Sequence, residues 1–318
     1  MGRARYDVNG RTVFITGAAR GIGAESARRL HAKGANVALV GLEPDRLEAL
    51  SAELGDRTAV FEADTTDPAA LERAVAGTVQ RFGGIDVAIA NAGIQRTGAV
   101  LTADPDAIER TIEVNLLGVW RTDRAVLPQI VERKGYLLNI ASLSAISHAP
   151  LMSAYTASKA GVEAFTDALR IETAPTGARI GCAYFGFIDT DIVRGSFAQP
   201  SNQAMLKMLP GPIGKPAPLS QAIDAIEKGV ERRSSRVWAP RFVGPLMLIR
   251  GIAQPISEWR MISLGRKQIA EAVRLADPAT GADRPEDPLL GAATLATGDA
   301  PTAADAAASP APEPAAKA

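Results

Sequence analysis

The sequence predicts a doubly wound α/β domain, in which helices cover both faces of a mainly parallel sheet. Short β-branched or apolar runs alternate with longer segments of helical period along most of the chain, which is the pattern of repeated strand-helix-strand units. The hydrophobic content of 47% in 318 residues is sufficient for the core of one such domain. A change of composition near the C-terminus sets the expected limit of that domain.

The individual elements follow from these runs. Strands are expected at residues 12–15, 36–40, 58–62, 87–90, 136–140, 179–184 and 236–239. Between them, helices are expected at residues 22–33, 44–54, 68–82, 105–133, 153–173 and 219–232. Two helix starts are readable, because Asp67 and Asp104 each place a capping acid before a proline at the first helical position.

The segment from Asp277 onward differs from the rest of the chain. It is rich in Ala, Pro, Asp and Thr and has no aromatic residue, so it buries too little apolar surface to offset the entropy of ordering. We predict a single folded domain over residues 1–276 and a disordered tail over residues 277–318. An alanine-rich helix is the alternative, but prolines interrupt it at Pro301, Pro310, Pro312 and Pro314.

Charge and cysteine content argue against several classes of protein. The 35 basic and 35 acidic residues leave no net charge, whereas nucleic-acid-binding proteins usually carry a basic surplus. The single cysteine, Cys182, allows no intrachain disulfide and is expected to be a core residue. With only two histidines beside it, we predict no metal site. The N-terminal segment has no apolar run of signal-peptide length, so we expect a cytoplasmic protein.

A glycine-rich segment directly follows the first expected strand. It reads Thr-Gly-Ala-Ala-Arg-Gly-Ile-Gly from Thr16 to Gly23, and a helical segment begins near Ile22. Glycines at such a junction let the backbone turn tightly and approach a pyrophosphate, whose charge the helix N-terminus favours. An ordinary glycine-rich turn is the alternative, but the position between a strand and a helix favours a dinucleotide site.

A tyrosine and a lysine stand four residues apart in the expected helix at 153–173. On a helix, Tyr155 and Lys159 share one face. A neighbouring ammonium favours the phenolate, so we expect Lys159 to lower the pKa of the Tyr155 hydroxyl toward the working range of a general acid or base. Such a group donates a proton to a ketone oxygen or removes one from an alcohol. The same spacing also occurs by chance on helix surfaces, so the prediction depends on the rest of the chain.

Several segments keep a shared order: the glycine loop, Asn91-Ala92-Gly93 after the fourth expected strand, and the Tyr155 and Lys159 pair. Together they resemble the short-chain dehydrogenase/reductase family over about residues 8–240. The resemblance implies a Rossmann-like sheet, a nicotinamide cofactor, and hydride transfer to or from a carbonyl or alcohol group of a small molecule. It also implies a homodimer or homotetramer.

The resemblance assigns roles to further residues. Ser142 is the expected donor to the substrate oxygen, with Ser144 as the neighbouring alternative, and Asn115 is expected to hold a water in a proton relay behind Lys159. Asn115 can also be read as a helix-bending polar residue satisfied by backbone. The expected cofactor-binding residues are Gly17, Arg20, Gly21, Ile22, Gly23, Glu43, Asp64, Asn91, Tyr155, Lys159 and Thr190.

The choice between NAD and NADP normally depends on the end of the second strand, where an acid binds the ribose hydroxyls or a base binds an extra phosphate. Gly41 and Leu42 stand at the usual places of the acid and the base. Glu43 would favour NAD by reaching the ribose, whereas Arg20 would favour NADP by pairing with a 2′-phosphate. Because Gly41 removes the expected repulsive carboxylate, we predict either cofactor with a slight preference for NADP.

Three features in the C-terminal part of the chain can each be interpreted in two ways. Phe185 replaces the family's proline and is either an aromatic wall of the site or a core residue. Residues 191–218 form either a segment that closes over a hydrophobic ketone or alcohol, or a surface helix packed on the core. Residues 242–256 are too short and interrupted to span a bilayer. For them a subunit interface or core packing is favoured over peripheral membrane contact.

The leading prediction is therefore an oxidoreductase that uses NAD(P) and acts on a hydrophobic carbonyl compound or secondary alcohol. The competing class is a catalytically silent dinucleotide-binding protein that acts as a redox sensor. The complete set of Asn115, Ser142, Tyr155 and Lys159 argues against the sensor.

Overall fold

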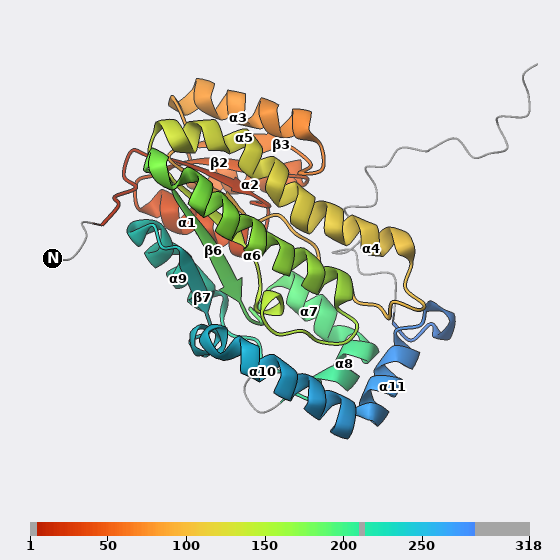
Figure 1. Ribbon diagram of the computed structural model, residues 1–318. Coiled ribbons are helices and arrows are strands. Elements are labelled where there is room, and N and C mark those ends of the chain that lie inside the picture. Colours follow the sequence, from red (N-terminus) through yellow and green to blue (C-terminus); the bar gives the residue numbers. More distant parts are fainter. Residues whose placement is uncertain (1–4, 210–213, 284–318) are drawn as a thin grey trace, which may run out of the picture.

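The computed structural model describes residues 5–209 and 214–283, and its centre is one seven-stranded sheet (Figure 1). All neighbouring strands are parallel, in the order β3-β2-β1-β4-β5-β6-β7. The strands are β1 (Thr12–Thr16), β2 (Asn36–Gly41), β3 (Thr58–Glu62), β4 (Val87–Ala90), β5 (Tyr136–Ile140), β6 (Arg179–Phe185) and β7 (Arg236–Ala239). The predicted doubly wound, Rossmann-like fold is confirmed.

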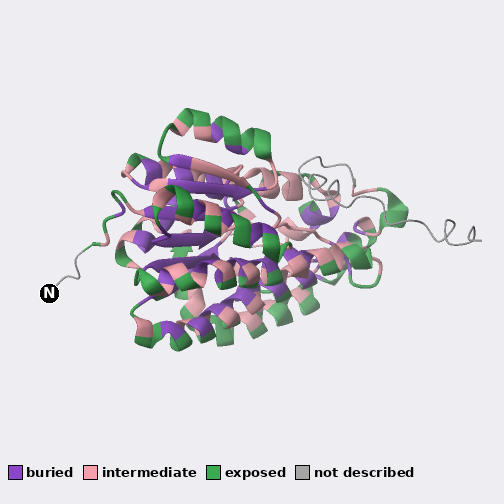
Figure 2. Ribbon diagram, turned by 90° about the horizontal axis from the view of Figure 1, so that it is seen from above, coloured by how far each residue is buried: buried purple, intermediate pink, exposed green. Residues whose placement is uncertain are grey.

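Helices cover both faces of this sheet, and the alternation of side chains along β1 shows how. Val13 and Ile15 pack into a core with α1 (Gly21–Ala32), α2 (Pro44–Leu54) and α9 (Leu219–Arg232). Phe14 points to the opposite face and packs with α3 (Pro68–Phe82), α5 (Gly118–Glu132) and α6 (Ser153–Thr173). The inner strands β1, β2, β4, β5 and β6 are therefore buried on both sides, as Figure 2 shows, which explains why they read as continuous apolar runs in the sequence. The edge strands β3 and β7 are only partly buried.

The strand order reverses beside β1, since the chain builds β2 and β3 on one side and β4 to β7 on the other. In open α/β sheets a ligand binds at such a switch point, outside the carboxyl ends of the strands. The glycine loop follows β1, Asn91 follows β4 and Ser142 follows β5, so the fold brings all three segments to this edge.

The single helix expected at residues 105–133 is wrong in one respect. The structure has α4 (Pro105–Ile112), a π-helical turn over Glu113–Leu117, and then α5. The widened turn contains Asn115, whose buried side chain bonds to a neighbouring loop, a contact that helical periodicity does not reveal. The two predicted caps are confirmed, because Asp67 accepts from the backbone N–H of Ala69 and Asp104 from that of Asp106.

The C-terminal part holds more helix than the sequence predicts. The segment at 191–218 contains α7 (Asp191–Ala198) and α8 (Pro200–Leu206), with residues 210–213 outside the described part. Beyond β7 come α10 (Val243–Leu264) and α11 (Arg266–Leu275). Among the described residues, none of the helices combines the length and the apolar content needed to span a bilayer.

The expected disordered tail begins too early. Residues 277–283 include a short 3-10 helix, Pro278–Thr280, and the Asp283 carboxylate accepts a hydrogen bond of 3.0 Å from the backbone N–H of Ser201 on α8. This contact orders a segment for which the composition alone predicts disorder. The rest of the predicted tail, residues 284–318, lies outside the described residues. Cys182 is buried in the core, as expected.

Candidate active site

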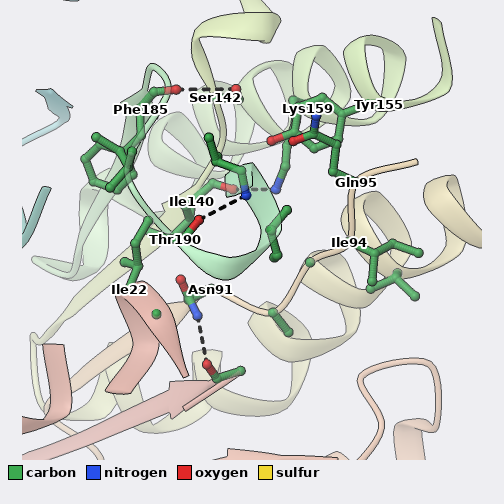
Figure 3. A pocket seen from close by; sticks show the side chains of 18 of the residues that line it. Ile22, Asn91, Ile94, Gln95, Ile140, Ser142, Tyr155, Lys159, Phe185 and Thr190 are labelled. Carbon is green, nitrogen blue, oxygen red and sulfur yellow. Dashed lines mark hydrogen bonds between the residues drawn. The ribbon is translucent and has the colours of Figure 1, made fainter. Parts of the chain in front are cut away.

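A cavity of about 350 Å³ opens at the switch point, along the carboxyl edge of the sheet (Figure 3). Every residue predicted for the site lines it except Gly23 and Asn115, which lie behind its wall. Figure 3 shows Ser142, Tyr155 and Lys159 on one side of the cavity and Ile22 and Asn91 on the other. The fold thus assembles predicted residues from seven segments around one space.

The glycine loop forms one end of the cavity, and its conformation requires glycine. Gly17 and Gly21 have φ of 64° and 55°, and a Cβ on Gly23 would lie 2.1 Å from the Gly17 carbonyl oxygen. The first turn of α1 has no capping side chain, since Arg20 at its N-cap position makes no such bond. The close-packed loop and the uncapped helix start suit a pyrophosphate, so this end fits a dinucleotide.

Two neighbours hold this loop in place. The Asn91 side-chain amide donates to the carbonyl oxygens of Thr16 and Gly17 at 3.0 and 3.1 Å. On the other side, the Thr190 hydroxyl caps α7 through the N–H of Val193, and a Cβ on Gly21 would lie 3.6 Å from its methyl carbon. Asn91, after β4, and Thr190, after β6, therefore both reach the glycine loop from the half of the sheet that holds β4 to β7.

The ion pair of Arg20 and Glu43 joins the two residues that favour opposite cofactors in the sequence. Their side chains meet at 2.8 Å, and each remains 22% exposed. The Arg46 Nε atom lies 3.6 Å from the same Oε1 atom of Glu43. Glu43 therefore has a second arginine within reach if Arg20 turns toward another anion.

A second ion pair lies beside the end of β3, and sequence reasoning missed one of its members. Arg110 on α4 donates to the Asp64 carboxylate at 2.9 Å and to the Thr66 hydroxyl at 3.2 Å. Burial acts to raise the pKa of Asp64, but the Thr66 N–H and Arg110 outweigh it and hold that pKa below its usual range. No sequence signal marks Arg110, because its role depends on how α4 packs beside β3.

Ser142 stands where β5 ends and a 3-10 turn, Leu143–Ala145, begins. Its hydroxyl accepts from the backbone N–H of Ser144 at 3.1 Å and donates to the Phe185 carbonyl oxygen at a long 3.4 Å. Its interaction with the Tyr155 hydroxyl acts to lower the pKa of that phenol. Of the two serines considered, Ser142 is therefore the one that meets the tyrosine.

Tyr155 and Lys159 lie one turn apart on α6, with the lysine Nζ 5.9 Å from the centre of the tyrosine ring. Lys159 is 4% exposed and donates to the Ile140 carbonyl oxygen at 2.9 Å. Burial lowers the pKa of the Lys159 ammonium to about 8, and no carboxylate of the described residues pairs with it.

The expected lowering of the Tyr155 pKa is wrong for this structure. Burial raises the pKa of the Tyr155 phenol, and the hydrogen bond with Ser142 offsets only part of the rise. The physical reason is that Lys159 sits in the same dry environment, which disfavours charge on both groups. The protonated phenol is the form that can donate to a carbonyl oxygen.

Asn115 lies fully buried behind the lysine. Its amide exchanges two hydrogen bonds of 2.8 Å with the backbone of Ile94 and donates a third to the Ser158 hydroxyl at 3.3 Å. These bonds match the interpretation of a polar residue satisfied by backbone. The water relay behind Lys159 stays a prediction.

The remaining walls are largely apolar. Phe185 is 4% exposed and belongs to the core, yet it also lines the cavity, so both interpretations of this residue hold. The segment from 191 is helical and contributes α7 to the wall, whereas its closure over a substrate stays a prediction. Apolar side chains in the remaining lining of the cavity are Ile94, Leu143, Met152, Phe187, Ile192, Val193 and Leu209.

Comparison with known proteins agrees with this geometry. The family model for short chain dehydrogenases matches residues 11–201. Oxidoreductase UcpA of Escherichia coli O157:H7 is 33% identical over 227 residues, which cover 70% of this chain and 86% of that protein.

Two solved structures share the fold. Levodione reductase aligns with a TM-score of 0.68 and 27% identity, covering 75% of this chain and 98% of its own. The 3-ketoacyl-(acyl-carrier-protein) reductase from Brucella melitensis complexed with NADH aligns at 0.64 and 25% identity, covering 73% and 97%. This chain belongs to the short-chain dehydrogenase family of oxidoreductases.

Proposed function

We propose that this protein transfers a hydride between NAD(P) and a carbonyl group or secondary alcohol of a hydrophobic small molecule. One observation carries the proposal: the hydroxyls of Ser142 and Tyr155 and the ammonium of Lys159 meet at the cavity that the glycine loop closes at its other end. A bound nicotinamide would supply or accept the hydride in this space.

The three side chains divide the work on the substrate oxygen. Ser142 donates a hydrogen bond to that oxygen, exchanging its long bond to Phe185 for a better one. Tyr155 donates the proton in reduction and removes it in oxidation. Lys159 holds the hydroxyls of the nicotinamide ribose, and its charge favours the phenolate once Tyr155 has given up its proton.

The cofactor preference proposed here is a slight one for NADP. The argument is that Arg20 can exchange Glu43 for a 2′-phosphate, because Arg46 lies within 3.6 Å of the same carboxylate and can keep its charge balanced. In the NAD complex the pair would remain, with Glu43 accepting from a ribose hydroxyl.

The substrate class follows from the walls. A pocket of apolar side chains with few polar groups selects an apolar molecule oriented by its one reacting oxygen. The cytoplasmic location and the homodimer or homotetramer expected from the sequence are parts of this proposal that still require measurement.

The test is a panel of alcohols and ketones, followed by nicotinamide absorbance with each cofactor, for the wild type and Tyr155→Phe. We expect turnover of at least one apolar compound and a loss of about 10² to 10⁴-fold in Tyr155→Phe. Cofactor binding, measured by calorimetry, should be equal in both proteins. If the wild type turns over nothing while both bind cofactor, the redox sensor is the better description.

A further inference from the structure

The outward face of α10 carries an apolar stripe that the rest of the described protein leaves uncovered. Leu248 is 89% exposed, Ile252 68% and Trp259 65%. Steps of three or four residues place them on one face of the helix. The full stripe is Leu248, Ile249, Ile252, Ile256 and Trp259.

The opposite face of α10 is fixed to the body of the protein. Arg250 donates two hydrogen bonds of 2.7 and 2.8 Å to the Glu163 carboxylate on α6, which the Tyr184 hydroxyl also reaches at 3.0 Å. Further along, the Gln254 side chain accepts from the backbone N–H of His148 at 2.9 Å. The stripe therefore cannot turn inward, and core packing does not account for it.

The surroundings of the stripe are basic, although the whole chain has no net charge. In residues 241–275, Arg250 pairs with Glu163 and Arg274 with Glu271. The basic side chains that remain are Arg241, Arg260, Arg266 and Lys267, against the acidic Glu258. Within the described residues, no carboxylate pairs with Arg260, Arg266 or Lys267. The stripe itself holds no charged residue.

We propose that this stripe docks the protein onto an anionic lipid surface. Apolar side chains and a tryptophan enter the boundary between head groups and acyl chains, while the surrounding basic residues attract anionic lipid. A second copy packed stripe to stripe would instead bring the basic surplus of each subunit against that of the other. Charge complementarity thus favours the lipid surface as the occupant.

The place of α10 gives this docking a consequence for the active site. A hollow of about 290 Å³ separates α10 from the loop at residues 148–150, and Ala149 of that loop also lines the active-site cavity. In Figure 1, α10 runs along the same side as α8 and α11. If the proposed function holds, a docked molecule would take its apolar substrate at the lipid surface.

The experiment is co-sedimentation of the full chain with vesicles of phosphatidylcholine alone or mixed with phosphatidylglycerol. We expect about tenfold more binding to the anionic vesicles, reduced by high salt. The double variant Ile252→Ser with Trp259→Ser should lose about tenfold or more of this binding. The matched control is Ile171→Ser, which removes another isoleucine, 76% exposed, from α6 and should bind as the wild type does.

Two results would overturn the docking. Wild-type protein that stays in the supernatant with both vesicle types contradicts it, as does a double variant that sediments like the wild type. Light scattering tests whether a second copy of the chain covers the stripe instead. That assignment follows if the wild type is a dimer that does not bind vesicles and the double variant is a monomer. Without vesicles, the wild type and the double variant should have the same activity on a water-soluble ketone. If neither protein has activity, that result contradicts the proposed function and leaves the docking proposal unaffected.

Discussion

The two ends of the active-site cavity treat charge in opposite ways. At the cofactor end, Arg20 pairs with Glu43 and Arg110 with Asp64, and all four side chains keep some contact with solvent. At the opposite end, Lys159 is buried and donates its hydrogen bond to a backbone carbonyl, and burial shifts its pKa and that of Tyr155 toward the neutral forms. Paired charges suit binding, whereas an unpaired buried charge keeps a proton easy to move.

Lys159→Met tests the catalytic side of this comparison and should have the largest effect. We expect activity to fall by about 10² to 10³-fold, because the phenolate loses its neighbouring charge. The same variant should unfold at a higher temperature at neutral pH, with a gain of about 1 kcal/mol, since an unpaired buried ammonium is removed. The folded pKa of about 8 lies below that of the unfolded chain, so the wild type should gain stability as pH rises above 8. Equal stability curves for the two proteins would contradict the unpaired charge.

Carbonyl reduction and alcohol oxidation are expected to depend differently on pH. The ratio of the oxidation rate to the reduction rate should rise by about tenfold per pH unit. The Tyr155 phenol has a raised pKa, so it stays protonated at neutral pH and carbonyl reduction should be level there, falling only in strong alkali. Alcohol oxidation needs the phenolate and should rise steadily with pH. Initial rates at low substrate, measured from pH 6 to about 10 in both directions, decide the matter. A reduction rate that climbs with pH would assign the proton to another group.

Breaking the ion pair at the cofactor end should change selectivity by about tenfold. Glu43→Gln frees Arg20 for a 2′-phosphate and should raise the ratio of kcat/KM for NADP over NAD, whereas Arg20→Ala should lower it. The control is Arg28→Ala, which removes an ion pair with Glu53 on the same face of the fold but outside the cavity. Equal shifts in all three variants would show that the pair contributes only to stability.

The smallest effect is expected at Asp123 in the core. Like Lys159, this residue is a buried titratable group whose pKa is shifted toward the neutral form. Burial raises the pKa of Asp123 to about 8, and neither its Oδ1 nor the Oδ1 of Asn139 has a partner. Since its folded pKa lies above the unfolded value, this carboxyl costs stability as pH rises toward 8. Asp123→Asn adds an amide that can donate to Asn139 and should stabilise the protein by about 1 kcal/mol at neutral pH. Thermal unfolding at acidic pH, where the two proteins should agree, provides the control.

The sequence predicted the sheet well because parallel strands buried on both faces leave unbroken apolar runs between turn residues. It also placed Ser142, Tyr155 and Lys159 in one site, since each stands at a fixed place in a strand-helix unit. The π turn at Asn115, the pairing of Arg20 with Glu43, and the approach of Arg110 to Asp64 all arise from contacts between distant segments. Periodicity and propensity carry no record of such contacts.

The ion pair of Arg250 and Glu163 couples the movement of α10 to that of α6. A single guanidinium nitrogen, Nη1 of Arg250, donates to both carboxylate oxygens of Glu163, so one charge-assisted contact joins the two helices. Glu163 lies one helical turn beyond Lys159 on α6. A load placed on α10 therefore reaches the helix that carries Lys159 directly, through one side chain, without first deforming the sheet.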